Sequence, residues 1–90
     1  MTRVGFKKLR GVNLPEEKQG LIRYTCLTCG EQPKHVQKKI QRLCQMCGGA
    51  ESAALREVMC TKRSITAIAL DHCVSESQLY RARKQFYESW

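Results

Sequence analysis

The chain has 90 residues, and 16 lysines and arginines against 8 acidic residues give it a net charge of +8 and an isoelectric point near 9.5. No stretch approaches the roughly 18 apolar residues of a membrane span, and the length excludes more than one ordinary domain or two very small ones. The charge indicates an anionic partner, nucleic acid above all, or a solvated surface that keeps a small protein in solution.

The positive charge is concentrated in the first half of the chain. Residues 1–50 have a net charge of +7 and residues 51–90 a net charge of +1. The first twenty residues mix basic side chains with glycines and a proline and show no lasting periodicity, which predicts a flexible basic arm. We expect phosphates or a partner protein to contact the basic residues Lys7, Lys8, Arg10, Lys34, Lys38, Lys39 and Arg42.

Residues 21–25 precede the first pair of cysteines. Their side chains alternate, with Ile22 and Tyr24 on one side. This period of two predicts a short strand that leads into a metal-binding turn.

Residues 33–43 are compatible with two structures. Val36, Ile40 and Leu43 have helical spacing, whereas a second short strand here would complete a zinc ribbon. We favour the ribbon, and a helix that starts after Gly49 would bring the module closer to a treble clef.

Two Cys-x-x-Cys-Gly motifs start at Cys26 and Cys44, and fourteen residues lie between Cys29 and Cys44. Two such turns can supply the four thiolates that a tetrahedral zinc ion needs at about 2.3 Å. The glycine after each second cysteine can adopt a positive φ and let the chain turn around the metal. The predicted ligands of one structural zinc ion are Cys26, Cys29, Cys44 and Cys47.

Other uses of these cysteines are less favoured. Disulfides need an oxidising compartment, and the N-terminal residues contain no apolar run of the length of a secretion signal, so we expect a cytoplasmic protein. A redox pair normally lies in a βαβ pattern, which surrounds neither motif. Another thiophilic metal is the remaining alternative. Zinc contributes on the order of 10–16 kcal/mol in finger peptides, comparable to the stability of a small domain.

After Gly49 the glycines stop and the residues favour helices. Apolar residues with helical spacing predict helices over residues 51–60, 65–72 and 76–88. Ser75 and Gln78 are placed to form a capping box at the start of the last helix.

The segment that joins the last two helices resembles the helix-turn-helix signature. Ala69 is small where two helices cross, Val74 and Leu79 fill the space between them, and Ala82 keeps the second helix close to the core. Cys73 departs from the pattern because it stands in the turn position where glycine is usual.

With Leu79 facing the core, polar side chains cover the outer face of the last helix. Arg81 suits guanine and Gln78 suits adenine, while Tyr80 and Lys84 suit phosphates or base edges. The alternative is an ordinary three-helix core with a hydrated polar face. The predicted DNA contacts are Ser75, Ser77, Gln78, Tyr80, Arg81 and Lys84.

The remaining cysteines and histidines are not expected to bind the metal. Cys60 and Cys73 lie on or beside apolar helix faces, so we predict that they pack in the core. His35 and His72 are predicted non-ligands. The sequence has no Ser/His/Asp set, carboxylate pair or phosphate-cradling loop, and a zinc ion with four thiolates has no open position for water, so we predict no enzymatic activity.

The segment from Ile68 to Lys84 is similar to the last part of the late antitermination proteins of lambdoid phages, some of which also carry paired Cys-x-x-Cys turns. The resemblance implies binding to a promoter-proximal DNA element and to RNA polymerase. It also implies that the zinc module can contact polymerase instead of DNA.

Together these features predict a small, mixed but mainly α-helical protein. It would have a basic flexible arm (1–20), a four-cysteine zinc ribbon or knuckle (21–49) and a three-helix helix-turn-helix unit (50–90). The predicted function is zinc-stabilised DNA binding in transcription regulation. The alternatives are an antitermination factor or adaptor that binds RNA polymerase through its zinc module, and an RNA-binding module. The oligomeric state stays open.

Overall fold

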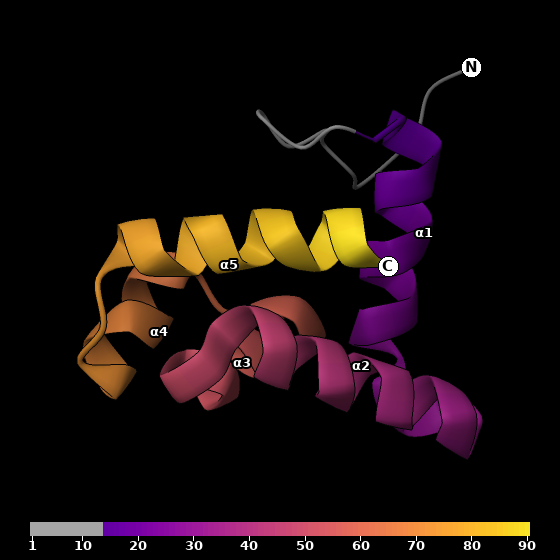
Figure 1. The fold of residues 1–90 in the computed structure, drawn as a ribbon, viewed down its shortest axis with the longest axis horizontal. Helices are drawn as coiled ribbons and strands as arrows, with labels where there is room; N and C mark the ends of the chain where they lie inside the picture. Colours follow the sequence, from indigo (N-terminus) through magenta and orange to yellow (C-terminus); the bar gives the residue numbers. More distant parts are fainter. Residues whose placement is uncertain (1–13) are drawn as a thin grey trace.

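The computed structural model describes residues 14–90, which are helical and contain no strand. The five α-helices of this part are α1 (Glu16–Leu27), α2 (Lys34–Gly48), α3 (Ser52–Cys60), α4 (Ile65–His72) and α5 (Glu76–Ser89). Short 3-10 turns, η1 (Cys29–Glu31) and η2 (Gly49–Glu51), follow α1 and α2. In Figure 1, α5 runs along α2 and α3, α1 stands across the C-terminal end of α5, and α4 lies below the start of α5. The prediction of a mainly α-helical protein is confirmed.

The predicted strand at residues 21–25 was wrong, because this segment lies inside α1. A strand would place Ile22 and Tyr24 on one face, yet Ile22 is 1% exposed and Tyr24 is 65% exposed. The buried residues Gln19, Ile22 and Cys26 instead follow one face of a helix. The predicted arm was also wrong from Glu16 to Gly20, which form the first turns of α1, while residues 1–13 lie outside the described part.

The preferred ribbon at residues 33–43 was wrong, and the helical alternative is what the structure has. Pro33 precedes the first residue of α2, a place where its missing N–H costs no hydrogen bond. Ile40, Leu43 and Cys44 form the buried stripe of this helix. Without strands before the two cysteine pairs, the described part of the chain contains no zinc ribbon.

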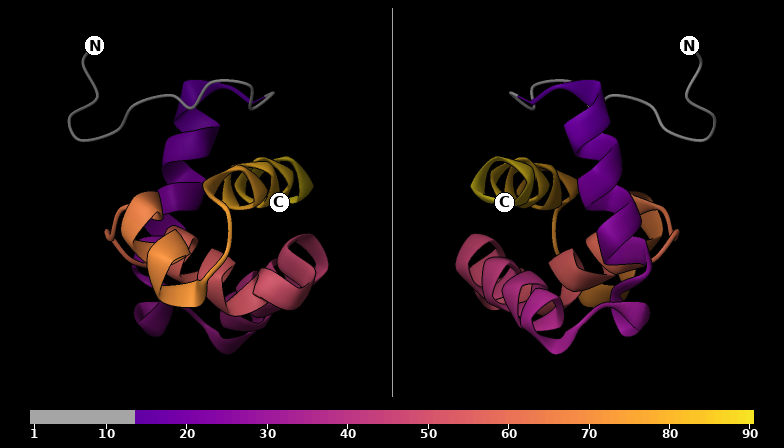
Figure 2. Two further views of the ribbon diagram at one scale, coloured as in Figure 1. Left: turned by 90° about the vertical axis from the view of Figure 1, so that its left-hand side faces the viewer. Right: turned by 90° about the vertical axis from the view of Figure 1, so that its right-hand side faces the viewer.

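A single hydrophobic core joins the two halves of the described chain. Ile22 and Ile40 from the first half pack in the same cluster as Leu55, Ile68 and Phe86 from the second. The two side views in Figure 2 show the helices gathered around this common centre. The predicted boundary near residue 50 therefore does not separate two cores.

The glycine after the second cysteine pair has a different role from the one predicted. Among the described glycines only Gly49 has a positive φ, at 54°. Gly48 is buried, and a Cβ atom there would lie 3.3 Å from the Cβ of Leu55. Gly48 thus allows α2 and α3 to pack closely, whereas the positive φ after α2 falls at Gly49.

The three predicted C-terminal helices are confirmed with bounds that differ by one residue or less. Ser64 caps the start of α4, and its hydroxyl accepts a hydrogen bond from the backbone N–H of Ala67 at 3.2 Å. Ser75 caps the start of α5, where it forms the predicted capping box with Gln78. None of the helices in residues 14–90 is long and apolar enough to cross a membrane.

Candidate metal centre and nucleic-acid interface

The cysteine pairs lie at the ends of α1 and α2. Cys26 is in the last turn of α1, Cys29 is in η1, and Cys44 is on the buried face of α2. These three side chains are 0%, 8% and 2% exposed, whereas Cys47 is only half-buried. Three of the four predicted ligands therefore face the core.

The structure adds Cys60, the last residue of α3, to the buried cysteines. Cys60 lies close to Cys26 and Cys29. The neighbouring thiol of Cys60, together with burial, raises the pKa of Cys26, while the neighbouring thiol of Cys26 lowers the pKa of Cys60. Cys44 lies close enough to Cys60 and Cys29 for the charges of these thiols to raise its pKa. We call Cys26, Cys29, Cys44 and Cys60 the thiol cluster.

Two arginines approach the thiol cluster. Arg23 on α1 donates hydrogen bonds to the backbone carbonyls of Met59 and Thr61, both at 2.9 Å, and also to Val58. Burial raises the pKa of Cys29 and of Cys44, and the nearby charge of Arg56 only partly opposes this rise. At Cys60, whose pKa is lowered, Arg56 acts in the same direction as the contact with Cys26. A cluster of thiolates would therefore have two guanidinium groups beside it.

No sequence pattern pointed to Arg23 or Cys60 as part of this cluster. No spacing pattern pairs Arg23 with residues 58–61, because that contact depends on how α1 packs against α3. Cys60 was predicted to pack in the core, and it does lie against the core while also contacting other thiols. The same prediction was wrong for Cys73, which is exposed.

In the described residues, no three side chains of His, Cys, Asp or Glu are arranged so that they could hold a metal ion as they stand. A zinc site of four thiolates would therefore need the cysteine side chains to move together.

The turn between α4 and α5 has the geometry that its sequence predicts. Cys73 adopts a left-handed conformation with φ 56° and ψ 42°, as a residue in place of glycine must. The N–H of Val74 donates to the carbonyl of Ala69 at 3.0 Å, which closes the end of α4. Leu79 and Ala82 are 0% and 7% exposed, so α5 packs closely on this unit.

All six predicted DNA contacts are exposed, but two of them are used by the helix cap. The hydroxyl of Ser75 accepts the N–H of Gln78 at 3.2 Å, and the side-chain oxygen of Gln78 accepts the N–H of Ser75 at 3.3 Å. Gln78 therefore keeps only its amide NH2 group for the predicted contact with adenine. The other four side chains are Ser77, Tyr80, Arg81 and Lys84.

The predicted phosphate contacts on α2 divide into two groups. Lys34, Lys38 and Arg42 are exposed and follow one another at intervals of four residues, so they form one stripe along the helix. Lys39 is half-buried, and its Nζ lies 4.2 Å from the ring centre of Trp90. Lys7, Lys8 and Arg10 lie outside the described residues. We call Lys34, Lys38 and Arg42 the basic stripe.

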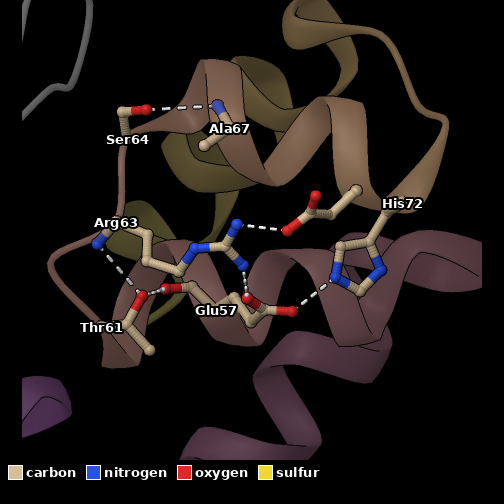
Figure 3. A network of polar contacts seen from close by, with 7 residues as sticks. Glu57, Thr61, Arg63, Ser64, Ala67 and His72 are labelled. Atoms are coloured by element: carbon tan, nitrogen blue, oxygen red, sulfur yellow. Dashed lines mark hydrogen bonds and ion pairs between the residues drawn. The ribbon is translucent and has the colours of Figure 1, made fainter.

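A network of charged side chains joins α3 to α4 (Figure 3). Glu57 contacts His72 at 2.5 Å and Arg63 at 2.7 Å, and Arg63 also pairs with Asp71. The hydrogen bonds from His72 and Arg63 lower the pKa of Glu57 below its ordinary value of 4.5. The network holds the loop before α4 against α3.

This network predicts a pH dependence of stability. A carboxyl group whose pKa is lower in the folded chain stabilises the fold above its unfolded pKa, and the effect disappears as the pH falls through the folded value. We expect the wild type to be more stable than Glu57→Gln above pH 4.5, the ordinary pKa, and this difference to vanish in acid. Urea unfolding over a pH series measures it. Glu31→Gln, at an exposed position, is the control, and a pH-independent difference for Glu57→Gln would contradict the prediction.

Comparison of the chain with protein-family models, with curated proteins and with solved structures finds no match.

Proposed function

We propose that the protein is a DNA-binding transcriptional regulator in which α4 and α5 act as a helix-turn-helix unit. The observation that carries the proposal is the outer face of α5, where Arg81 and Lys84 are exposed to solvent. Exposed cations on one face of a helix can contact the phosphates and base edges of DNA.

The N-terminal half of α5 supports this role. The capping box leaves Ser77, Tyr80 and Arg81 within two turns of the helix start, the part of a recognition helix that contacts base edges. Arg81 can donate two hydrogen bonds to guanine, and Lys84, one turn further on, suits a phosphate. The ring of Tyr80 lies 5.1 Å from the guanidinium of Arg83, so one of its faces is covered.

The basic stripe on α2 gives the protein a second surface for phosphates. α2 contains no acidic residue, and the three cations of the stripe are exposed. Each phosphate that they neutralise should steepen the fall of log affinity with log salt by about 0.9. We propose that the basic stripe adds affinity and that α5 adds sequence preference.

A structural zinc ion bound by cysteines is part of this proposal. Three of the four predicted ligands are buried together at the junction of α1, η1 and α2, where thiolates without a metal would be costly. The ion would stabilise the helices that carry the basic stripe.

The test is the affinity of the full chain for duplex DNA selected from a random pool. Arg81→Ala should weaken binding by about 1–3 kcal/mol, which is about 5- to 150-fold, and should relax the sequence preference at one base pair. The matched control is Lys18→Ala, which removes an exposed cation from α1. An equal loss in both variants would contradict base reading by α5, and tighter binding of single-stranded RNA would favour the RNA-binding alternative.

The adaptor function has an observation of its own. Leu21 and Tyr24 on α1 are 63% and 65% exposed, on a helix other than the proposed recognition helix. Exposed apolar side chains are typical of protein contacts, and RNA polymerase is the partner that an antitermination factor would need. Loss of polymerase binding in Tyr24→Ala, with DNA binding unchanged, would support this second function.

A further inference from the structure

A small pocket opens between α2 and α3. Its volume is about 140 Å³, and the residues that line it are Gln41, Cys44, Gln45, Ser52, Ala53 and Arg56. Cys44 is almost completely buried, whereas Gln41, Gln45 and Arg56 are exposed. Cys44 therefore lies at the inner end of the pocket, and the polar side chains lie around its mouth. We call this site the α2–α3 pocket.

The polar side chains of the α2–α3 pocket come from two helices that pack against each other. Gln41 and Gln45 are one turn apart on α2. Ser52 and Arg56 are likewise one turn apart on α3. Their two carboxamides, hydroxyl and guanidinium can all donate hydrogen bonds, and none of the six lining residues is acidic. The pocket therefore offers donors and a positive charge, which suit an anion.

The size and the surroundings of the α2–α3 pocket favour a phosphate group. Pockets for drug-sized ligands have larger volumes, of about 300–1,000 Å³. The basic stripe lies directly beside the pocket, because Lys38 and Arg42 each precede one of its two glutamines by three residues on α2. A guanidinium can bind two phosphate oxygens at once, and the cations of the stripe add positive charge around the same place.

We propose that the α2–α3 pocket binds one phosphate group of the DNA backbone, with Arg56 as its principal donor. The inference rests on the proposed DNA binding and adds α3 to the surface that contacts the duplex. Phosphate contacts fix the orientation of a protein on DNA but carry no sequence information. Loss of Arg56 should therefore weaken binding to all sequences alike, whereas loss of Arg81 should change the sequence preference.

The first test measures the affinity of full-length Arg56→Gln for duplex DNA over a range of salt concentrations. The slope of log affinity against log salt should be shallower than that of the wild type by about 0.9, the value for one phosphate. Arg56→Lys keeps the charge and should keep the slope, although it lacks the two-pronged contact. The matched control is Lys18→Gln, which removes an exposed cation from α1. Because Arg56 is exposed, Arg56→Gln should unfold at the temperature of the wild type.

Equal slopes for Arg56→Gln and Lys18→Gln would overturn the phosphate contact in the α2–α3 pocket. Base reading by α5 would be unaffected by that result, because it depends on the sequence preference of Arg81→Ala.

The second test uses inorganic phosphate and needs no DNA. In amide NMR spectra of the full chain, phosphate should shift the signals of Ser52 and Ala53 at the start of α3, and chloride at the same ionic strength should not. Equal phosphate shifts in the wild type and in Arg56→Gln would overturn the role of Arg56. Phosphate shifts in a wild type that binds no DNA would refute the proposed function and identify a free phosphate compound as the ligand of the pocket.

Discussion

Removal of zinc from the loaded protein should unfold α1 and α2 and reduce the helical signal in far-ultraviolet circular dichroism. The predicted ligands lie on α1, η1 and α2, and three of the four are almost completely buried. Structural zinc contributes on the order of 10–16 kcal/mol in finger peptides, whereas small domains unfold at a cost of about 5–15 kcal/mol. The metal term is therefore large enough to decide whether the first half of the chain folds.

The measurement is a titration of the zinc-loaded chain with a zinc-selective chelator, followed by thermal unfolding. Helicity should return when excess zinc is added, which separates metal removal from irreversible damage. The cysteines can also be buried without a metal, because a buried free cysteine acts as a small apolar side chain. If chelation leaves the melting curve of the loaded protein unchanged, the thiol cluster contributes to stability only by packing in the core.

The second half of the fold could be predicted because its local signals agree with each other. The apolar spacing of α4 and α5 has a helical period, Ser64 and Ser75 cap the two helices, and Cys73 stands in the left-handed turn. Each signal acts within a few residues, so no long-range contact is needed to recognise it. For this reason the predicted and observed bounds of these helices almost coincide.

The first half could not be predicted in the same way because its motifs suggested another fold. Paired Cys-x-x-Cys turns are typical of zinc ribbons, and the alternation of Ile22 and Tyr24 supported a strand. The burial of Gln19, Ile22 and Cys26 on one face of α1 depends on α3, which begins 25 residues after α1 ends. Packing against distant residues stabilises a helix in this segment, and a short alternation of side chains in the sequence does not reveal that packing.

The cysteine motifs predicted part of the candidate site. Cys26, Cys29 and Cys44 lie together in the core, as their motifs suggested. The hydrogen bonds of Arg23 to the carbonyls of Met59 and Thr61 join residues separated by 36 and 38 positions. No spacing rule describes these bonds, since they exist only when α1 packs on α3.

Phe86→Ala should produce the largest loss of stability of any substitution on α5. Phe86 is 0% exposed, belongs to the core that both halves share, and its ring centre lies 6.0 Å from that of Trp90. Replacing a buried phenylalanine by alanine costs about 3–5 kcal/mol, since apolar contacts are lost and a cavity remains. That is a large share of the about 5–15 kcal/mol of a small domain, so the variant should unfold at much lower urea concentrations.

The matched control is Tyr80→Ala on the same helix. Tyr80 is 47% exposed, so its removal should change the unfolding free energy by no more than about 0.5 kcal/mol. If α5 reads DNA, however, Tyr80→Ala should weaken DNA binding while the fold stays intact. Unfolding free energies from urea titrations of the zinc-loaded proteins distinguish the two variants. Equal stability of Phe86→Ala and Tyr80→Ala would contradict the packing of α5 described above, and with it the rigid support that a recognition helix needs.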